Sequence, residues 1–139
     1  YGKIFKIKKK IFDFKKKHID EKKILFELKK NRIDLICLAS FMKILSKTFI
    51  KNFNGKILNI HPSLLPKFKG LNTHERAIQN KEKFSGCTVH YVSSKLDSGK
   101  IILQKKVKIN KKDTSKSLAK KVLKQEHILY FKAIKKIIF

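Results

Sequence analysis

The amino-acid sequence predicts an α/β fold in which helices flank an open, mainly parallel sheet, and three observations point to it. Two short apolar runs, at residues 33–39 and 56–60, flank a segment with helical features at residues 46–53, and a strand–helix–strand order is typical of parallel sheets. Apolar residues recur at intervals of three and four between residues 118 and 134, which predicts a long amphipathic helix. A length of 139 residues suits one domain, so we expect a single domain over residues 1–139.

The first part of the chain contains one ambiguous segment and one helix. Residues 5–14 are basic with interleaved Ile and Phe, a pattern that fits either an edge strand or a loop. Residues 19–30 are predicted to form an amphipathic helix, because Ile24, Leu25 and Leu28 recur at helical spacing. Acidic residues near the start of this segment and lysines near its end suit the helix dipole.

Two predicted strands and the helix between them follow. The run at residues 33–39 is mostly apolar, as is typical of a parallel strand that is buried on both faces. Residues 46–53 are predicted to form a short helix that is closed by Gly55. A second buried strand is expected over residues 56–60, ending abruptly at His61.

The remaining elements are predicted from turn residues and from periodicity. Thr73 is expected to cap a helix that runs to about Asn80. Residues 84–92 and 100–109 are predicted strands, separated by the turn residues Asp-Ser-Gly at 97–99. The stripe of the last helix consists of Leu118, Ala119, Val122, Leu123, Leu129, Tyr130, Ala133 and Ile134.

The charge of the chain is extreme. Lys and Arg number 36 against 10 Asp and Glu, which gives a net charge of +26, and Arg32 and Arg76 are the only arginines. Proteins that read nucleic acids use arginine for bidentate contacts to phosphate and guanine, so we interpret the lysines as a solvated coat on an ordinary fold. This coat should attract anionic substrates, and it should bind nucleic acids or acidic membranes only non-specifically at low salt. We therefore expect no specific nucleic-acid partner and no membrane partner.

The cysteines and histidines show no metal-binding pattern. Cys37 and Cys87 lie in apolar runs without C-x-x-C spacing, and the five histidines lack the spacing of a zinc site. We therefore expect no disulfide framework and no metal, as suits a protein of the reducing cytoplasm. The longest apolar runs fall far short of the roughly 20 residues that span a bilayer, so no transmembrane helix is expected.

Polar residues stand at the carboxyl end of the second predicted strand, where open α/β sheets bind ligands. Asn59 and His61 are two residues apart, so both side chains point to the same side of an extended chain. There an amide and an imidazole could polarise a carbonyl and move a proton. Pro62 and Pro66 should make the following loop rigid. An ordinary turn would also suit these residues, and spacing leaves open whether Asp97 is a plain turn residue or a carboxylate that reaches His61.

Three ordered blocks of sequence resemble the formyltransferase family that uses 10-formyltetrahydrofolate. The blocks are NIHPSLLPKFKG at residues 59–70, GCTVHYV at 86–92 and LDSGKII at 96–102, and the resemblance runs from about Gly2 to the end. The segments GLNTHERA at 70–77 and QEH at 125–127 are most similar to the members that formylate 5'-phosphoribosylglycinamide in purine (IMP) biosynthesis. The resemblance implies a Rossmann-like open sheet and transfer of a formyl group to that small-molecule substrate without a metal.

The resemblance also implies roles for individual residues. It implies that Asn59, His61 and Asp97 form the catalytic set, in which His61 donates a proton and Asp97 favours the protonated imidazole. It implies a folate pocket lined by Met42, Lys43, Ile44, Leu45, Asn59, Ser93, Ser94, Lys95, Leu96 and Asp97, with Lys17 near the folate tail. It implies ribonucleotide contacts from Leu123, Lys124, Gln125 and Glu126.

The resemblance leaves a gap and several alternatives. Relatives begin with a strand and a glycine-rich loop that holds the substrate phosphate, and nothing here matches them, so we expect the sequence to lack an amino-terminal segment. Formyltetrahydrofolate deformylase shares the same Asn, His and Asp but uses water, and methionyl-tRNA formyltransferase is another relative. Pro62 and the segment at residues 73–76 argue against both. A basic nucleic-acid-binding module and a catalytically inactive remnant are further alternatives, and we expect a monomer or a homodimer.

Overall fold

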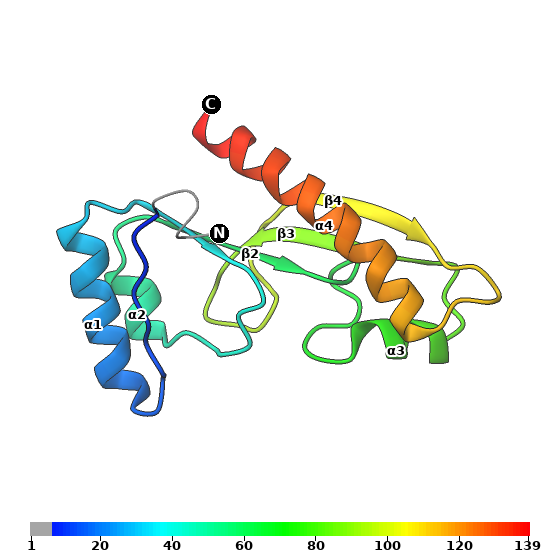
Figure 1. Cartoon of the computed structure of the whole chain (residues 1–139), viewed down its shortest axis with the longest axis horizontal. Coiled ribbons are helices and arrows are strands. Elements are labelled where there is room, and N and C mark those ends of the chain that lie inside the picture. The colour runs from blue at the N-terminus through cyan, green and yellow to red at the C-terminus, as the bar shows by residue number, and fades with distance from the viewer. Residues whose placement is uncertain (1–6) are drawn as a thin grey trace.

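A computed structural model describes residues 7–139 of the chain, and within them one sheet is flanked by helices (Figure 1). Residues 7–14 form neither helix nor strand, and the rest of the ambiguous basic segment lies outside the described residues. The elements in chain order are α1 (Lys17–Lys30), β1 (Leu35–Leu38), α2 (Lys47–Asn52), β2 (Lys56–His61), α3 (Thr73–Gln79), β3 (Phe84–Tyr91), β4 (Ile101–Lys108) and α4 (Ser115–Ile138).

The four strands of the sheet lie in the order β1-β2-β3-β4. β1 and β2 are parallel, because α2 carries the chain back between them, whereas β2–β3 and β3–β4 are antiparallel. The predicted α/β class, the open sheet and the flanking helices are confirmed, and the sheet is mixed where the sequence predicted mainly parallel order. The register places Asn59 opposite His90 and His61 opposite Thr88.

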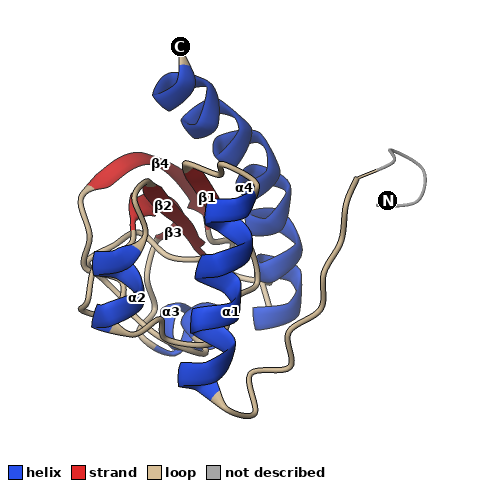
Figure 2. Ribbon diagram, turned by 90° about the vertical axis from the view of Figure 1, so that its left-hand side faces the viewer, coloured by secondary structure: helices blue, strands red, loops and turns tan. Residues whose placement is uncertain are grey.

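Two apolar clusters cover opposite faces of the sheet, and β2 contributes to both. Ile57 packs in a cluster with Phe49 of α2 and with Phe53, the residue that directly follows α2. Ile60, three positions along the strand, packs with the buried stripe of α4. In Figures 1 and 2, α4 runs along the sheet and its C-terminal turns extend beyond the strands. This alternation places Asn59 and His61 on the same face as Ile57.

Two local predictions are wrong. β1 is only half-buried and Cys37 is exposed, because β1 is an edge strand of the described sheet rather than a strand covered on both faces. Thr73 is the first residue of α3 and not its cap. Asn72 precedes the helix in the left-handed conformation (φ 56°), with no side-chain capping hydrogen bond.

The segment between β1 and α2 carries several predicted pocket residues, and hydrogen bonds anchor its end. Ser46 caps α2, because its side chain accepts a hydrogen bond from the Phe49 amide at 3.0 Å. The amide of Ser46 in turn donates to the carboxylate of Glu21 at 2.8 Å, and Glu21 is buried on α1. α1 therefore fixes the point at which the chain leaves the pocket and enters α2.

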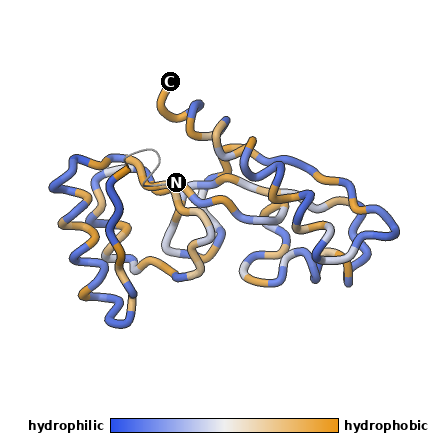
Figure 3. The backbone as a smooth tube through the Cα atoms, viewed as in Figure 1, coloured by the Kyte–Doolittle hydropathy of each residue, from blue (hydrophilic) through white to orange (hydrophobic). Residues whose placement is uncertain are grey.

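Hydrophilic residues recur along the helices and loops of the described chain (Figure 3), whereas β1 consists of apolar residues alone. This distribution fits a cationic coat that is spread over the fold. Within residues 7–139, no helix combines the length and the apolar character needed to cross a bilayer.

Candidate active site

The structure brings Asp97 to His61. His61 is the last residue of β2, and Asp97 lies in the loop between β3 and β4. His61 Nδ1 is 3.4 Å from Asp97 Oδ2, and each of the two side chains is 8% exposed. A carboxylate at this distance from a ring nitrogen can orient the imidazole ring. Asp97 is therefore more than a plain turn residue, because its carboxylate faces the imidazole of His61.

The loop at residues 68–70 contacts both members of this pair. His61 Nε2 lies 2.9 Å from the Phe68 carbonyl oxygen, and the Gly70 amide donates to Asp97 Oδ2 at 2.9 Å. A protonated His61 can donate from both ring nitrogens, to the carbonyl on one side and the carboxylate on the other. Asp97 itself has a left-handed backbone (φ 44°), so surrounding contacts must hold it in an unfavourable conformation.

His90 is the site residue that sequence reasoning missed. Its Nδ1 donates to the Tyr91 carbonyl at 2.8 Å, so its Nε2 is left to face Asn59 Nδ2 at 3.4 Å and Asp97 Oδ1 at 3.7 Å. A neutral His90 accepts a hydrogen bond from the Asn59 amide and sets which way that amide points. The signal that could have found it is the cross-strand register, because β3 places His90 opposite Asn59.

We expect the protein to lose stability in acid, because two of its histidines are shielded from water. Burial lowers the pKa of His90, which the Tyr91 carbonyl and Asp97 oppose only in part. Burial also lowers the pKa of His74, and the charge of His61 adds to that effect. Both folded-state pKa values therefore lie below the ordinary 6.5, and the unfolded chain binds more protons as the pH falls. Their contribution to stability is fully present above about pH 6.5 and is lost as the pH falls through the folded-state values.

Urea unfolding at a series of pH values tests this prediction. We expect the free energy of unfolding to decrease between about pH 7 and pH 5, and the decrease to be shallower in His74→Gln. His18→Gln, which changes an exposed histidine on α1, is the matched control and should leave the slope unchanged. An identical slope in His74→Gln and wild type would contradict the assignment.

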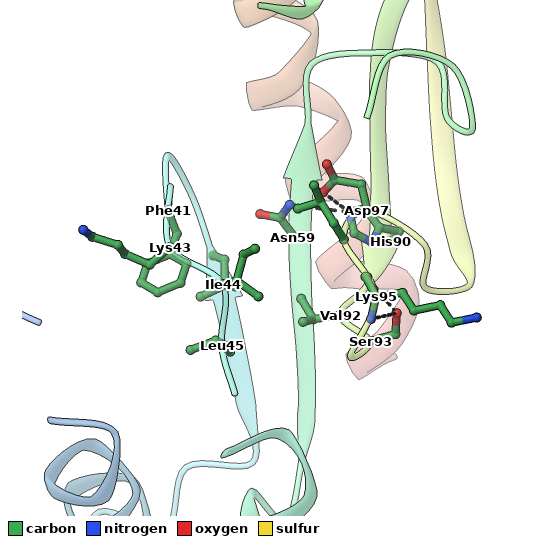
Figure 4. Close-up of a pocket in the computed structure, with 12 residues that line it drawn as sticks. Phe41, Lys43, Ile44, Leu45, Asn59, His90, Val92, Ser93, Lys95 and Asp97 are labelled. Atoms are coloured by element: carbon green, nitrogen blue, oxygen red, sulfur yellow. Dashed lines mark hydrogen bonds and ion pairs between the residues drawn. The ribbon is translucent and has the colours of Figure 1, made fainter. Parts of the chain in front are cut away.

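Two cavities meet at Asn59 and Asp97. A small cavity of about 70 Å³ lies between the segment after β1 and the loop after β3 (Figure 4). A cleft of about 970 Å³ lies between the end of β2, the segment before α3 and one face of α4. Asn59 and Asp97 line both, and His61 lines the cleft. The catalytic candidates are therefore where two ligands could meet.

Most of the residues predicted for the folate pocket line the small cavity. They are Lys43, Ile44, Leu45, Asn59, Ser93, Lys95, Leu96 and Asp97. Met42 lines only the cleft, whereas Ser94 and Lys17 line neither cavity. The ammonium groups of Lys43 and Lys95 extend away from Asn59 and Asp97 in Figure 4.

Of the four residues predicted to contact a ribonucleotide, Leu123 and Glu126 line the cleft. Lys124 and Gln125 do not, because successive helical residues turn by about 100° and only one face of α4 meets the cleft. That face also includes Ala119, His127 and Tyr130. Burial raises the pKa of Glu126, and His127 opposes this only in part.

Neither a metal nor a thiolate is indicated at the site. Over residues 7–139, His, Cys, Asp and Glu form no group of three that could hold a metal ion. Burial raises the pKa of Cys87 to about 12, so its thiol stays protonated near neutral pH and is a poor nucleophile. The arrangement supplies instead an amide donor, an imidazole and a carboxylate around one point.

Comparisons with known proteins place the chain in a family. Residues 3–134 match the formyl transferase family. Phosphoribosylglycinamide formyltransferase of Escherichia coli is 42% identical over 107 residues, which are 77% of this chain and 50% of that protein. The human trifunctional purine biosynthetic protein adenosine-3 is 48% identical over 103 residues, which are 74% of this chain and 10% of that protein. The chain thus spans half or less of these curated relatives.

Solved structures match nearly the whole length of this chain. The crystal structure of phosphoribosylglycinamide formyltransferase from Streptococcus pneumoniae has a TM-score of 0.92 and 32% identity, covering 99% of this chain and 78% of that one. The Bacillus halodurans structure of the same name has a TM-score of 0.91 and 37% identity, with coverage of 98% and 72%.

Proposed function

Because this chain belongs to the formyl transferase family, we propose that it transfers the formyl group of 10-formyltetrahydrofolate to the amine of 5'-phosphoribosylglycinamide. One observation carries the proposal: Asn59 and Asp97 line both the small cavity and the cleft, and His61, which lines the cleft, faces Asp97. A donor in one cavity and an acceptor in the other would present their reacting atoms to this amide and imidazole. We place this reaction in the cytoplasm, as a step of purine biosynthesis.

The reaction is proposed to begin with attack of the substrate amine on the formyl carbon. A C–N bond forms, the carbonyl oxygen gathers negative charge, and Asn59 Nδ2–H and protonated His61 donate hydrogen bonds to it. The Nε2 proton of His61, which faces the Phe68 carbonyl, would turn to this oxygen when substrates bind. When the resulting tetrahedral intermediate collapses, the bond from the formyl carbon to N10 of the folate breaks. N10 takes up the proton that the amine loses, with Asp97 and a water assisting the transfer.

The dimensions of the two cavities support different occupants. The small cavity is well below the roughly 300 Å³ of a typical ligand pocket, so the folate would have to extend into the adjoining cleft. Its apolar wall, formed by residues such as Leu45 and Val92, suits a flat ring. Glu126 in the cleft could accept hydrogen bonds from ribose hydroxyls, and the cationic coat favours an anionic phosphate.

A formyl-donor hydrolase is the second candidate, because the same three side chains could activate water. The size of the cleft favours a larger acceptor. The test is to incubate the protein with 10-formyltetrahydrofolate, with and without 5'-phosphoribosylglycinamide. We expect a formylated amine only when the acceptor is present. Release of formate at the same rate without the acceptor would identify the hydrolase, and no consumption of the folate would refute both.

A further inference from the structure

The segment at residues 68–71 holds the catalytic pair from one side, and it lies outside every helix and strand. It supplies the Phe68 carbonyl to His61 and the Gly70 amide to Asp97, each at 2.9 Å. Phe68 and Gly70 both have left-handed backbones, with φ of 53° and 77°. Regular secondary structure therefore does not explain why this segment keeps one shape, which leaves tertiary contacts to hold it.

Arg76 on α3 is that anchor. Its Nη1 donates to the Lys69 carbonyl at 2.7 Å and to the Leu71 carbonyl at 3.2 Å, the two carbonyls that flank Gly70. Its guanidinium also lies over the Phe68 ring, 5.3 Å from the ring centroid. One side chain thus contacts three of the four residues of the segment, and it leaves the Phe68 carbonyl to His61 and the Gly70 amide to Asp97.

A guanidinium suits this task and an ammonium does not. The guanidinium is planar, so it can lie over an aromatic ring while its N–H groups point outward to carbonyls in the same plane. An ammonium is a compact charge on a flexible stem, so it would hold the ring and the two carbonyls in a much less defined geometry. Lysine serves as the cation almost everywhere else in this chain. The other arginine, Arg32, is exposed after α1, and its side chain makes no hydrogen bond or ion pair with a described residue.

We propose that Arg76 is a positioning residue, which acts through residues 68–71 to hold His61 and Asp97 in their working geometry. The role rests on the proposed function only where turnover is concerned, since the geometry it controls can be measured without substrate. A purely structural arginine would instead stabilise α3 and the fold with no specific effect on the Gly70 amide or the His61 ring.

The experiment compares Arg76→Lys with wild type and with the control Arg32→Lys. Three quantities are measured: hydrogen exchange of backbone amides, the ring-nitrogen resonances of His61, and kcat and KM for formyl transfer. We expect the Gly70 amide of Arg76→Lys to exchange at least about tenfold faster, and the His61 resonances to shift, while amides of β2 and β3 keep their protection. We expect kcat to fall roughly 10- to 100-fold with little change in either KM, because small misplacements of reacting groups are costly. Arg32→Lys should match wild type in every measurement.

Two results would overturn the proposal. One is an Arg76→Lys protein with wild-type Gly70 exchange and His61 resonances. The other is exchange that accelerates equally across the sheet, which would show a general loss of stability. If Arg76→Lys does not fold, Phe68→Leu removes the ring contact and keeps the backbone carbonyl, and it should show the same changes to a smaller degree. A wild-type protein without formyl transfer would refute the proposed function, and the Gly70 and His61 measurements would still decide the role of Arg76.

Discussion

His61→Ala and Asp97→Asn are each expected to reduce kcat for formyl transfer at least about 100-fold while leaving the binding of a folate analogue largely unchanged. His61→Ala removes one of the two donors to the developing oxyanion. Asp97→Asn keeps a group of the same size but removes the negative charge that faces His61 Nδ1 at 3.4 Å. A neutral amide would leave no negative charge opposite the imidazole when the oxyanion forms.

Turnover and binding are measured separately, by single-turnover kinetics and by titration with a non-reactive folate analogue. The controls are His18→Ala and Asp34→Asn, which change exposed residues of the same types far along the chain from the site. Near-normal turnover in either site variant would refute the mechanism. A loss of analogue binding equal to the loss of turnover would show that the residue binds the folate rather than assisting the reaction.

Much of the fold follows from local patterns. The helix of residues 17–30, the strands on either side of α2 and the long α4 all lie where apolar spacing places them. The direction of β3 and β4 could not be predicted in this way, because it depends on how long-range connections return across the sheet. Burial of β1 was also overestimated, since an apolar run does not reveal whether a strand lies at an edge.

The site was predictable where a regular element carries it. Asn59 and His61 share a face of β2 by strand alternation, and no loop geometry is needed to see this. The approach of Asp97 to His61 depends instead on left-handed residues in two loops, Phe68 and Asp97 among them, and no spacing rule encodes it. His90 and Arg76 were missed for a related reason: their importance comes from cross-strand register and from tertiary contact rather than from a sequence motif.

Gly99→Ala is the second change for which we expect a large effect, and its cause is steric. A Cβ at Gly99 would lie 1.7 Å from the Tyr91 carbonyl oxygen and 2.7 Å from its carbon, so one backbone segment must move. Tyr91 is tied to the same turn, because its amide donates to the Lys100 carbonyl at 2.9 Å. The displaced residues flank His90 on one side and Asp97 on the other. We expect a loss of about 1–3 kcal/mol in the free energy of unfolding, together with a fall of roughly 100-fold in kcat.

Gly70→Ala is the matched comparison, because the same methyl group meets open space there and a strained backbone instead of a steric clash. The added Cβ would be 3.7 Å from the nearest atom, in Leu96, so space is available, but the left-handed backbone (φ 77°) disfavours a side chain by roughly 1–2 kcal/mol. The Gly70 amide that donates to Asp97 remains in place. Urea unfolding and kcat are measured for both variants. Gly99→Ala should lose the more activity of the two, because only its methyl group forces the backbone between His90 and Asp97 to move. An equal or smaller loss would show that the loop after β3 yields without disturbing the carboxylate.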